Sequence, residues 1–134
     1  MAKERQTRQR ELILTALHES GSALSAEAVW MRARASCPNL ALTTVYRNLE
    51  RLTLEHKVRV LPMPEGATRY FPEGEHRHHV ICMGCDRIIE LDDCPLGDME
   101  ERLQQDLGFT VAYHALELYG YCARCRAAKE SDHA

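Results

Sequence analysis

The chain has 134 residues, 17 Lys and Arg against 20 Asp and Glu, and a formal net charge of −3. This length fits one domain or two small ones, and no apolar run approaches the roughly 20 residues that cross a bilayer. The first residues, MAKERQTRQR, contain no apolar segment of a secretory signal. These features predict a soluble cytoplasmic protein with no membrane partner. Because thiols stay reduced there, the six cysteines are expected to bind metal or to pack before they form disulfides.

The first half of the chain predicts three short helices. Apolar residues favour a helix over residues 7–20, which Thr7 would cap. Ser25 would cap a second helix over residues 26–35. In a third helix, over residues 42–55, apolar residues recur at three- and four-residue spacing. The opposite face of this third helix is polar and basic, with Thr43, Thr44, Tyr46, Arg47 and Arg51.

A β-hairpin is predicted next. Two β-like runs, residues 57–62 and 67–71, are joined by a Pro-Glu-Gly turn sequence. Three helices followed by a hairpin predict a winged helix-turn-helix over residues 1–72. This half holds 11 Lys and Arg against 7 Glu, a balance of +4, whereas residues 73–134 hold 6 basic and 13 acidic residues, a balance of −7. The basic half indicates contact with nucleic acid, although uneven solvated faces would explain the charge alone.

The second half of the chain changes to a mixed pattern, so the fold class is predicted as α+β with a small C-terminal α/β domain over residues 73–134. The pattern predicts, in chain order, short strands at 80–82 and 87–91, a helix at 96–107 and a strand at 109–119. The polar tail from Arg126 onwards is expected to be frayed.

Two cysteine pairs carry the strongest chemical signal, Cys82-x-x-Cys85 and Cys122-x-x-Cys125. Such pairs on tight turns can place four sulfurs about 2.3 Å from one Zn²⁺ and leave no open coordination position. A closed site of this kind is structural, and its binding energy contributes to folding. Redox-active or simply buried cysteines are the alternative.

Three histidines, His76, His78 and His79, stand just ahead of Cys82. On an extended strand His76 and His78 would face one side and His79 the other. One short stretch is therefore expected to supply ligands to two different metal sites. The alternative is that these histidines are only solvated polar groups of a surface strand.

Three other residues, Glu90, His114 and His56, are candidate ligands of the same metal ions. Glu90 lies in an otherwise apolar run, where a buried carboxylate needs a cation. His114 lies in the predicted late strand, and the alternative there is a hydrogen-bonded core histidine. His56 follows the third helix, where a histidine is also favoured by the helix dipole alone.

These motifs, in this order, resemble the ferric uptake regulator superfamily of bacterial metal-sensing repressors. The resemblance rests on Thr7-x-Gln9-Arg10, Ser25-Ala26-Glu27, Leu42–Leu49, Arg69-Tyr70, His78–Cys82 with Cys85, Ile89-Glu90, Gly108-Phe109, His114 and Leu118–Cys122 with Cys125. It implies a homodimer built on the C-terminal domain, with winged helices that bind a palindromic operator in double-stranded DNA. Ala41 stands where the family has a serine, so the cap of the third helix is lost unless Thr43 replaces it.

The resemblance also implies roles for individual residues. Cys82, Cys85, Cys122 and Cys125 match the ligands of a structural Zn²⁺. The expected DNA contacts are Thr43, Thr44, Tyr46, Arg47, Arg51 and Arg10. The expected sensing site at the hinge comprises His56, His79, Glu90 and Glu73 or Glu75. The expected second site comprises His76, His78, His114 and an acidic ligand, Asp98 or Glu100.

The regulatory ion is expected to be a divalent metal, with Zn²⁺ favoured over Fe²⁺ or Mn²⁺. Glu90-x-x-x-Cys94-Pro95 looks like a segment of some zinc uptake regulators, and His56 matches a ligand position of that branch. Cys37 and Cys94 themselves are expected to be packing residues.

The sequence therefore predicts a metal-responsive repressor of metal-uptake or metal-homeostasis genes, zinc-sensing in the first place, and not an enzyme. An iron or manganese sensor and a peroxide sensor of the same family are the alternatives within it. Outside the family, a zinc enzyme is one alternative, but the chain lacks the His-Glu-x-x-His motif of many zinc enzymes. A zinc-ribbon interaction module would leave the basic face of the third helix unexplained.

Overall fold

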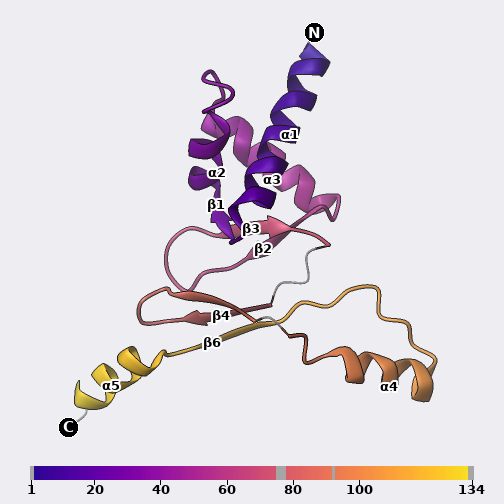
Figure 1. Ribbon diagram of the computed structural model, residues 1–134, viewed down its shortest axis with the longest axis vertical. Coiled ribbons are helices and arrows are strands. Elements are labelled where there is room, and N and C mark those ends of the chain that lie inside the picture. The colour runs from indigo at the N-terminus through magenta and orange to yellow at the C-terminus, as the bar shows by residue number, and fades with distance from the viewer. Residues whose placement is uncertain (1, 75–77, 92, 133–134) are drawn as a thin grey trace. The chain divides into compact units, whose positions relative to one another are not determined.

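The computed structural model describes residues 2–74, 78–91 and 93–132. The chain divides into two compact units, Met1–Glu75 and His76–Ala134 (Figure 1). No helix in these described ranges is long and apolar enough to cross a membrane.

Three helices form most of the first unit. They are α1 (Ala2–Ser20), α2 (Ala26–Ala33) and α3 (Leu42–Leu54). The predicted cap at Thr7 is wrong, because α1 begins earlier and the Thr7 hydroxyl donates a hydrogen bond to the Lys3 carbonyl inside the helix, at 3.0 Å. The preceding residues are mostly good helix formers, and Glu4 in the first turn complements the helix dipole.

The two later helices begin differently. Ser25 caps α2 as predicted, and its hydroxyl accepts a hydrogen bond from the Ala28 N–H at 3.1 Å. Ala41 occupies the corresponding position before α3 with an extended backbone and no side-chain cap. Thr43 therefore does not replace the missing serine, and α3 begins without a side-chain acceptor for its first N–H groups.

Helix α3 ends in a left-handed turn. His56 has a φ of 61°, and the following Lys57 N–H donates to the Leu52 carbonyl at 2.9 Å. This is the hydrogen bond of a Schellman ending, in which glycine or asparagine usually holds the left-handed position. A histidine there has an unfavourable backbone conformation.

A single hydrophobic core joins the three helices. The Trp30 indole N–H also donates to the Leu40 carbonyl at 2.7 Å, which ties the loop before α3 to α2. The core residues with no exposed surface are Ile13, Leu17, Val29, Val45, Leu49 and Leu52.

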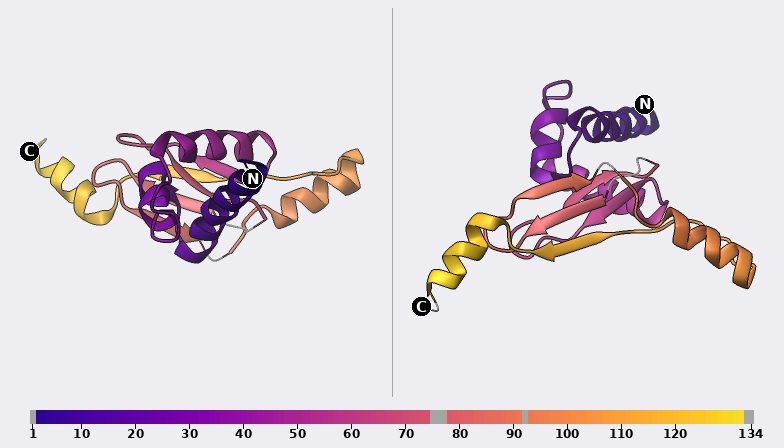
Figure 2. Two further views of the ribbon diagram at one scale, coloured as in Figure 1. Left: turned by 90° about the horizontal axis from the view of Figure 1, so that it is seen from above. Right: turned by 60° about the horizontal axis from the view of Figure 1, so that its bottom comes forward.

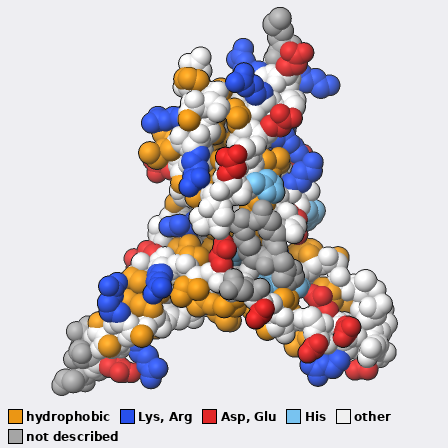
Figure 3. All heavy atoms as spheres, in the orientation of Figure 1, with side chains coloured by type: hydrophobic (Ala, Val, Ile, Leu, Met, Phe, Trp, Pro, Cys, Tyr) orange, Lys and Arg blue, Asp and Glu red, His pale blue; other side chains and the backbone are white. Residues whose placement is uncertain are grey.

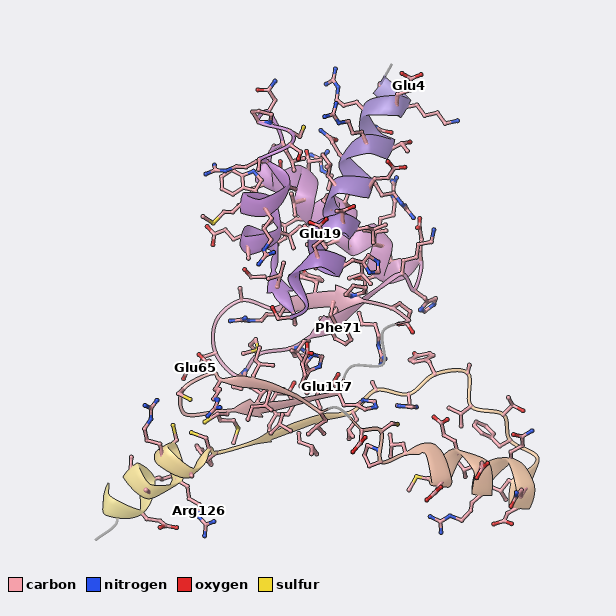
Figure 4. The ribbon with its side chains drawn as sticks, viewed as in Figure 1. Glu4, Glu19, Glu65, Phe71, Glu117 and Arg126 are labelled. Carbon is pink, nitrogen blue, oxygen red and sulfur yellow. The ribbon has the colours of Figure 1, made fainter. Side chains whose placement is uncertain are left out.

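A three-stranded antiparallel sheet completes the first unit. Its strands are β1 (Leu24–Ser25), β2 (Val58–Leu61) and β3 (Arg69–Pro72), in the order β1-β3-β2. The β2–β3 hairpin confirms the prediction, whereas the two-residue strand β1 has no sequence signal. Phe71 on β3 is buried (Figure 4). Helices α1, α2 and α3 followed by this hairpin are consistent with the predicted winged-helix layout.

The second unit is built on another three-stranded sheet, with strands β4 (His78–Cys82), β5 (Ile88–Leu91) and β6 (Glu117–Gly120). The order is β5-β4-β6, with β5 antiparallel and β6 parallel to the central β4. Helices α4 (Gly97–Leu107) and α5 (Ala123–Asp132) extend from opposite ends of this sheet (Figure 2).

Two predictions in the second unit are wrong. The predicted strand over 109–119 is regular only from Glu117, and residues 109–116 are irregular. In this chain β6 pairs with β4 over Glu117–Gly120 only, so the rest of the run has no ladder partner. The tail predicted to fray forms α5, where helix-forming residues and an Arg126–Glu130 pair at 3.1 Å support a helix.

The uncapped start of α3 gives a stability prediction. Ala41→Ser is expected to raise the free energy of unfolding by about 1 kcal/mol, because the extended backbone of residue 41 already suits a capping side chain. Urea unfolding followed by helical circular dichroism measures the change. Ser25→Ala is the matched control and is expected to lose about the same amount. No gain for Ala41→Ser beside a loss for Ser25→Ala would contradict the prediction.

Candidate metal centres and nucleic-acid interface

Four cysteines meet in the second unit. Cys82 and Cys85 flank the turn after β4, and Cys122 and Cys125 lie where β6 meets α5, a place marked by gathered sulfur atoms in Figure 4. All four Sγ atoms lie within 4.8 Å of one another, and the Cys85 and Cys122 sulfurs are 4.0 Å apart. Tetrahedral zinc with Zn–S bonds of about 2.3 Å places its sulfurs about 3.8 Å apart. This four-cysteine cluster therefore fits a closed zinc site.

The electrostatics of the four-cysteine cluster favour a cation. Backbone N–H groups of Cys122 and Gly84 lie 3.3 and 3.4 Å from the Cys82 sulfur. The hydrogen bond from Cys122, followed by those from other backbone N–H groups, lowers the pKa of Cys82 to about 6. Hydrogen bonding to the Cys122 and Cys82 sulfurs raises the pKa of Cys125 to about 12. Four thiolates so close together need a divalent ion to share their charge.

Glycine is required in the first cysteine turn. A Cβ atom added to Gly84 would lie 2.8 Å from both the Cβ and the Sγ atoms of Cys125. Real Cβ atoms do not approach other heavy atoms so closely, so any side chain here would displace Cys125. Sequence reasoning missed this residue, because the contact joins segments far apart in the chain.

A second group of donors lies between β4 and α4. His78, Cys94 and His114 have ligand atoms that all lie within 4.8 Å of one another, and we call this group the mixed cluster. The Glu100 carboxylate contacts Nδ1 of His114. Cys94 was expected to be a packing residue, and its sulfur lies against both imidazoles.

The remaining residues of the expected second site lie elsewhere. Asp98 is exposed on α4 and does not belong to the group of possible ligands that includes His78 and His114. His76 lies outside the described residues, as does Glu75, the alternative to Glu73 at the hinge. The Glu-x-x-x-Cys-Pro pattern was the one sequence signal that could have pointed to Cys94.

Two of the expected hinge ligands lie in each unit. In the second unit, His79 on β4 is opposite Glu90 on β5, and its Nε2 lies 3.8 Å from the Glu90 Oε1. The alternation of His78 and His79 between two groups confirms the period-two prediction. In the first unit, His56 is followed by Lys57, whose carbonyl accepts a hydrogen bond from the Glu73 N–H at 3.0 Å.

Glu73 has a further partner within its own unit. One of its carboxylate oxygens lies 3.5 Å from Nε of Arg59. Any metal ligation by Glu73 therefore competes with this ion pair.

A basic groove of about 910 Å³ runs between α1 and α3 in the first unit. Blue side chains in Figure 3 mark the Lys and Arg residues that gather along this helical part of the surface. Thr44, Arg47 and Arg51 of α3 line the groove, whereas Thr43 and Tyr46 are exposed on the same helix. The cationic residues of the lining are Lys3, Arg5, Arg10, Arg47 and Arg51.

Arg10 already has an acidic partner in this groove. Its guanidinium donates two hydrogen bonds to the Glu55 carboxylate, at 2.5 and 3.3 Å. The same hydrogen bonding lowers the pKa of Glu55. Any DNA phosphate would have to compete with Glu55 for Arg10, whereas Arg47 and Arg51 are exposed side chains.

The crowded turn gives a prediction for metal affinity. Gly84→Ala is expected to weaken zinc binding at the four-cysteine cluster, because the added methyl group introduces an overpacking cost of about 1–3 kcal/mol. Competition with a chromogenic zinc chelator measures the affinity. Met83→Ala, a change at an exposed side chain of the same turn, is the control and should leave the affinity unaltered. Equal zinc retention by both variants would contradict the prediction.

Known proteins resemble this chain along nearly its whole length. It is 35% identical over 131 residues to the "Ferric uptake regulation protein" of Bacillus subtilis (strain 168), covering 94% of this chain and 87% of that protein. The structure of the Campylobacter jejuni peroxide stress regulator matches with a TM-score of 0.77 at 25% identity, covering 92% of this chain and 93% of the other. FurB from M. tuberculosis, a zinc uptake regulator, matches with a TM-score of 0.53 at 32% identity, covering 91% and 95%. The profile of the Ferric uptake regulator family matches residues 2–119, and this chain belongs to that family.

Proposed function

We propose that this protein is a metal-responsive, DNA-binding transcriptional repressor of metal-uptake or metal-homeostasis genes. The basic groove between α1 and α3 is the observation that carries the proposal, because a chain of net charge −3 concentrates cations there. Clustered cations supply the affinity of a protein for the phosphate backbone of DNA. Thiolate and imidazole donors lie in the other unit, so a ligand can be sensed apart from the DNA-binding surface.

Helix α3 is the element proposed to enter the major groove. Tyr46 is 49% exposed and can contact a thymine methyl group, and exposed Arg47 can donate to guanine or to phosphate. Arg51 lies one helical turn further along and would contact the phosphate backbone. In this proposal Arg10 and Glu55 hold the rim of the groove in place.

A homodimer is the proposed assembly. The second unit exposes large apolar side chains that this chain alone does not cover, among them Met99, Leu107, Phe109 and Tyr113. Several large exposed apolar side chains in one unit support a protein interface. Two copies related by a twofold axis would present two α3 helices to a palindromic operator.

The proposed switch uses the two pairs of hinge ligands. A bound divalent ion would supply the attraction that joins His56, with or without Glu73, to His79 and Glu90. Such a connection between the units would favour the arrangement that binds the operator. His56 occupies a strained left-handed position that asparagine would hold better. A residue that is suboptimal for the fold is expected where function requires its side chain.

Zinc is the proposed regulatory metal. His79, His56 and carboxylate ligands suit Zn²⁺, Fe²⁺ or Mn²⁺. Resemblance to the zinc uptake regulator FurB supports zinc among these ions. The chain also resembles a ferric uptake regulation protein and a peroxide stress regulator. The promoter-binding experiment below therefore compares Zn²⁺ with Fe²⁺, Mn²⁺ and peroxide.

The DNA contact of α3 can be tested by one charge removal. Arg47→Ala is expected to weaken binding to a fragment of the protein's own promoter and to lower the slope of log K against log salt by about one. Fluorescence anisotropy over a series of salt concentrations measures both quantities. Arg102→Ala removes one exposed charge from α4 and is the matched control. An equal slope for the Arg47 and Arg102 variants would contradict the assignment of α3.

The metal switch can be tested at its position in the first unit. His56→Asn keeps a residue that tolerates the left-handed backbone but removes the imidazole. We expect buffered Zn²⁺ to strengthen promoter binding of the unaltered protein by about 5–150-fold, and the variant to lose most of that gain. The zinc content of the four-cysteine cluster should stay the same in both.

The same titration identifies the ligand. A response to Fe²⁺ or Mn²⁺ but not to Zn²⁺, measured without oxygen, would contradict zinc sensing. Loss of DNA binding only after peroxide treatment of the metal-bound protein would favour the peroxide sensor. Promoter binding independent of every metal would contradict the repressor proposal itself.

A further inference from the structure

Cys94 lies in the segment between β5 and α4 and has no role in the proposed DNA-binding switch. Its Sγ atom is 3.3 Å from Nε2 of His78 and 3.4 Å from Nε2 of His114. The two Nε2 atoms are 3.2 Å apart. Three donor atoms from β4, the β5–α4 connection and the irregular segment before β6 therefore form one small triangle.

The sides of this triangle match metal coordination. A tetrahedral zinc ion with Zn–N bonds of about 2.0–2.1 Å and a Zn–S bond of about 2.3 Å separates two nitrogens by about 3.3 Å and a nitrogen from sulfur by about 3.5 Å. We infer that Cys94, His78 and His114 bind a divalent metal ion, with Cys94 as its thiolate ligand. The mixed cluster thus replaces the carboxylate expected from Asp98 or Glu100 with sulfur.

Glu100 acts on this site through His114. Its carboxylate accepts a hydrogen bond from Nδ1 of that imidazole, so the proton is on Nδ1 and the lone pair of Nε2 is directed toward Cys94 and His78. A carboxylate behind a ligating histidine fixes both the tautomer and the orientation of the ring. Glu100 is therefore a positioning residue, which would act on the metal only through the His114 ring.

Packing alone accounts less well for this arrangement. His78 is 1% exposed, and its ring stacks on that of His114 with centroids 4.9 Å apart. Two imidazoles and a thiol that turn their donor atoms inward to one point place three lone pairs together, an arrangement that a cation stabilises.

The donor set determines the class of metal. One thiolate and two imidazoles suit Zn²⁺ and Co²⁺, whereas Mn²⁺ and Mg²⁺ prefer oxygen ligands. Among the described residues this site has three ligands, whereas the four-cysteine cluster has four. The site is independent of the hinge pairs, His56 with Glu73 and His79 with Glu90, which contain no sulfur.

The test uses Co²⁺ on the full-length protein whose four-cysteine cluster is filled with Zn²⁺. Zinc binds such a site more tightly than cobalt, so added Co²⁺ occupies other sites. We expect a saturable thiolate-to-cobalt charge-transfer absorption in the near ultraviolet, together with the visible bands of tetrahedral cobalt. Cys94→Ser should abolish the charge-transfer absorption. Cys37→Ser is the matched control and should retain it, because Cys37 lies in the first unit outside both described groups of possible ligands.

Glu100→Gln tests the positioning role. It should keep the charge-transfer absorption but weaken Co²⁺ affinity by about 10–100-fold, the effect of losing the partner of a ligating histidine. Unaltered zinc content and helical circular dichroism show that the variants are folded.

Cobalt binding by the unaltered protein without a charge-transfer absorption would overturn the inference, as would an absorption that survives Cys94→Ser. Neither result bears on the repressor proposal, which is decided by whether promoter binding of the unaltered protein depends on metal.

Discussion

The second unit buries few apolar side chains, and its four cysteines lie together where a metal ion could hold its parts. Among its described residues, the buried apolar ones are Ile81 and Cys82, and α4 contributes none. The first unit, by contrast, buries side chains from all three of its helices in one cluster. A structural zinc site supplies about 10–16 kcal/mol of apparent binding energy, as much as the whole stability of a typical domain. A zinc ion at the four-cysteine cluster would therefore contribute more to the order of β4, β6 and α5 than packing does.

The parallel pairing of β4 with β6 fixes the register on which the groups of candidate ligands depend. Cys82 is paired with Gly120 and His79 with Glu117 along the parallel β4–β6 ladder. A slip of one residue in β4 would exchange the faces of its side chains. His78 would then leave the mixed cluster, and His79 would leave Glu90. The position of the sulfurs at one end of β4 thus decides which histidine serves which group of ligands.

The features that sequence reasoning identified are those that depend on local spacing. Alternation along a strand separates His78 from His79, the cysteine pairs specify their own turns, and the stripe Val45–Leu49–Leu52 defines α3. The features that it missed depend on contacts between distant segments. Gly84 is needed only because Cys125 lies against it, and Cys94 meets two imidazoles only because residues 16 and 20 positions away approach it.

Two segments of the second unit, residues 109–119 and the C-terminal tail, also depend on contacts that their composition does not show. The apolar and aromatic run at 109–119 has strand composition, but a strand needs a partner, and β4 pairs only with its last part, Glu117–Gly120. The tail after Cys125 looks too polar to order, yet α5 begins at Ala123 within the second cysteine pair, and a turn fixed there would remove the cost of starting a helix. Neither the missing partner nor the fixed first turn is visible in composition.

The mixed cluster connects the parts of the second unit that packing holds least. His78 belongs to the central strand, Cys94 precedes α4, and His114 belongs to the irregular segment. Met99 lies on α4 and Phe109 follows it, and both are exposed. An ion held by these three ligands would therefore order the same surface that a second copy of the chain is proposed to cover. Ordering that surface before association lowers the entropic cost of association. Metal occupancy and dimer stability would then be linked, and by reciprocity dimerisation would tighten metal binding at the mixed cluster.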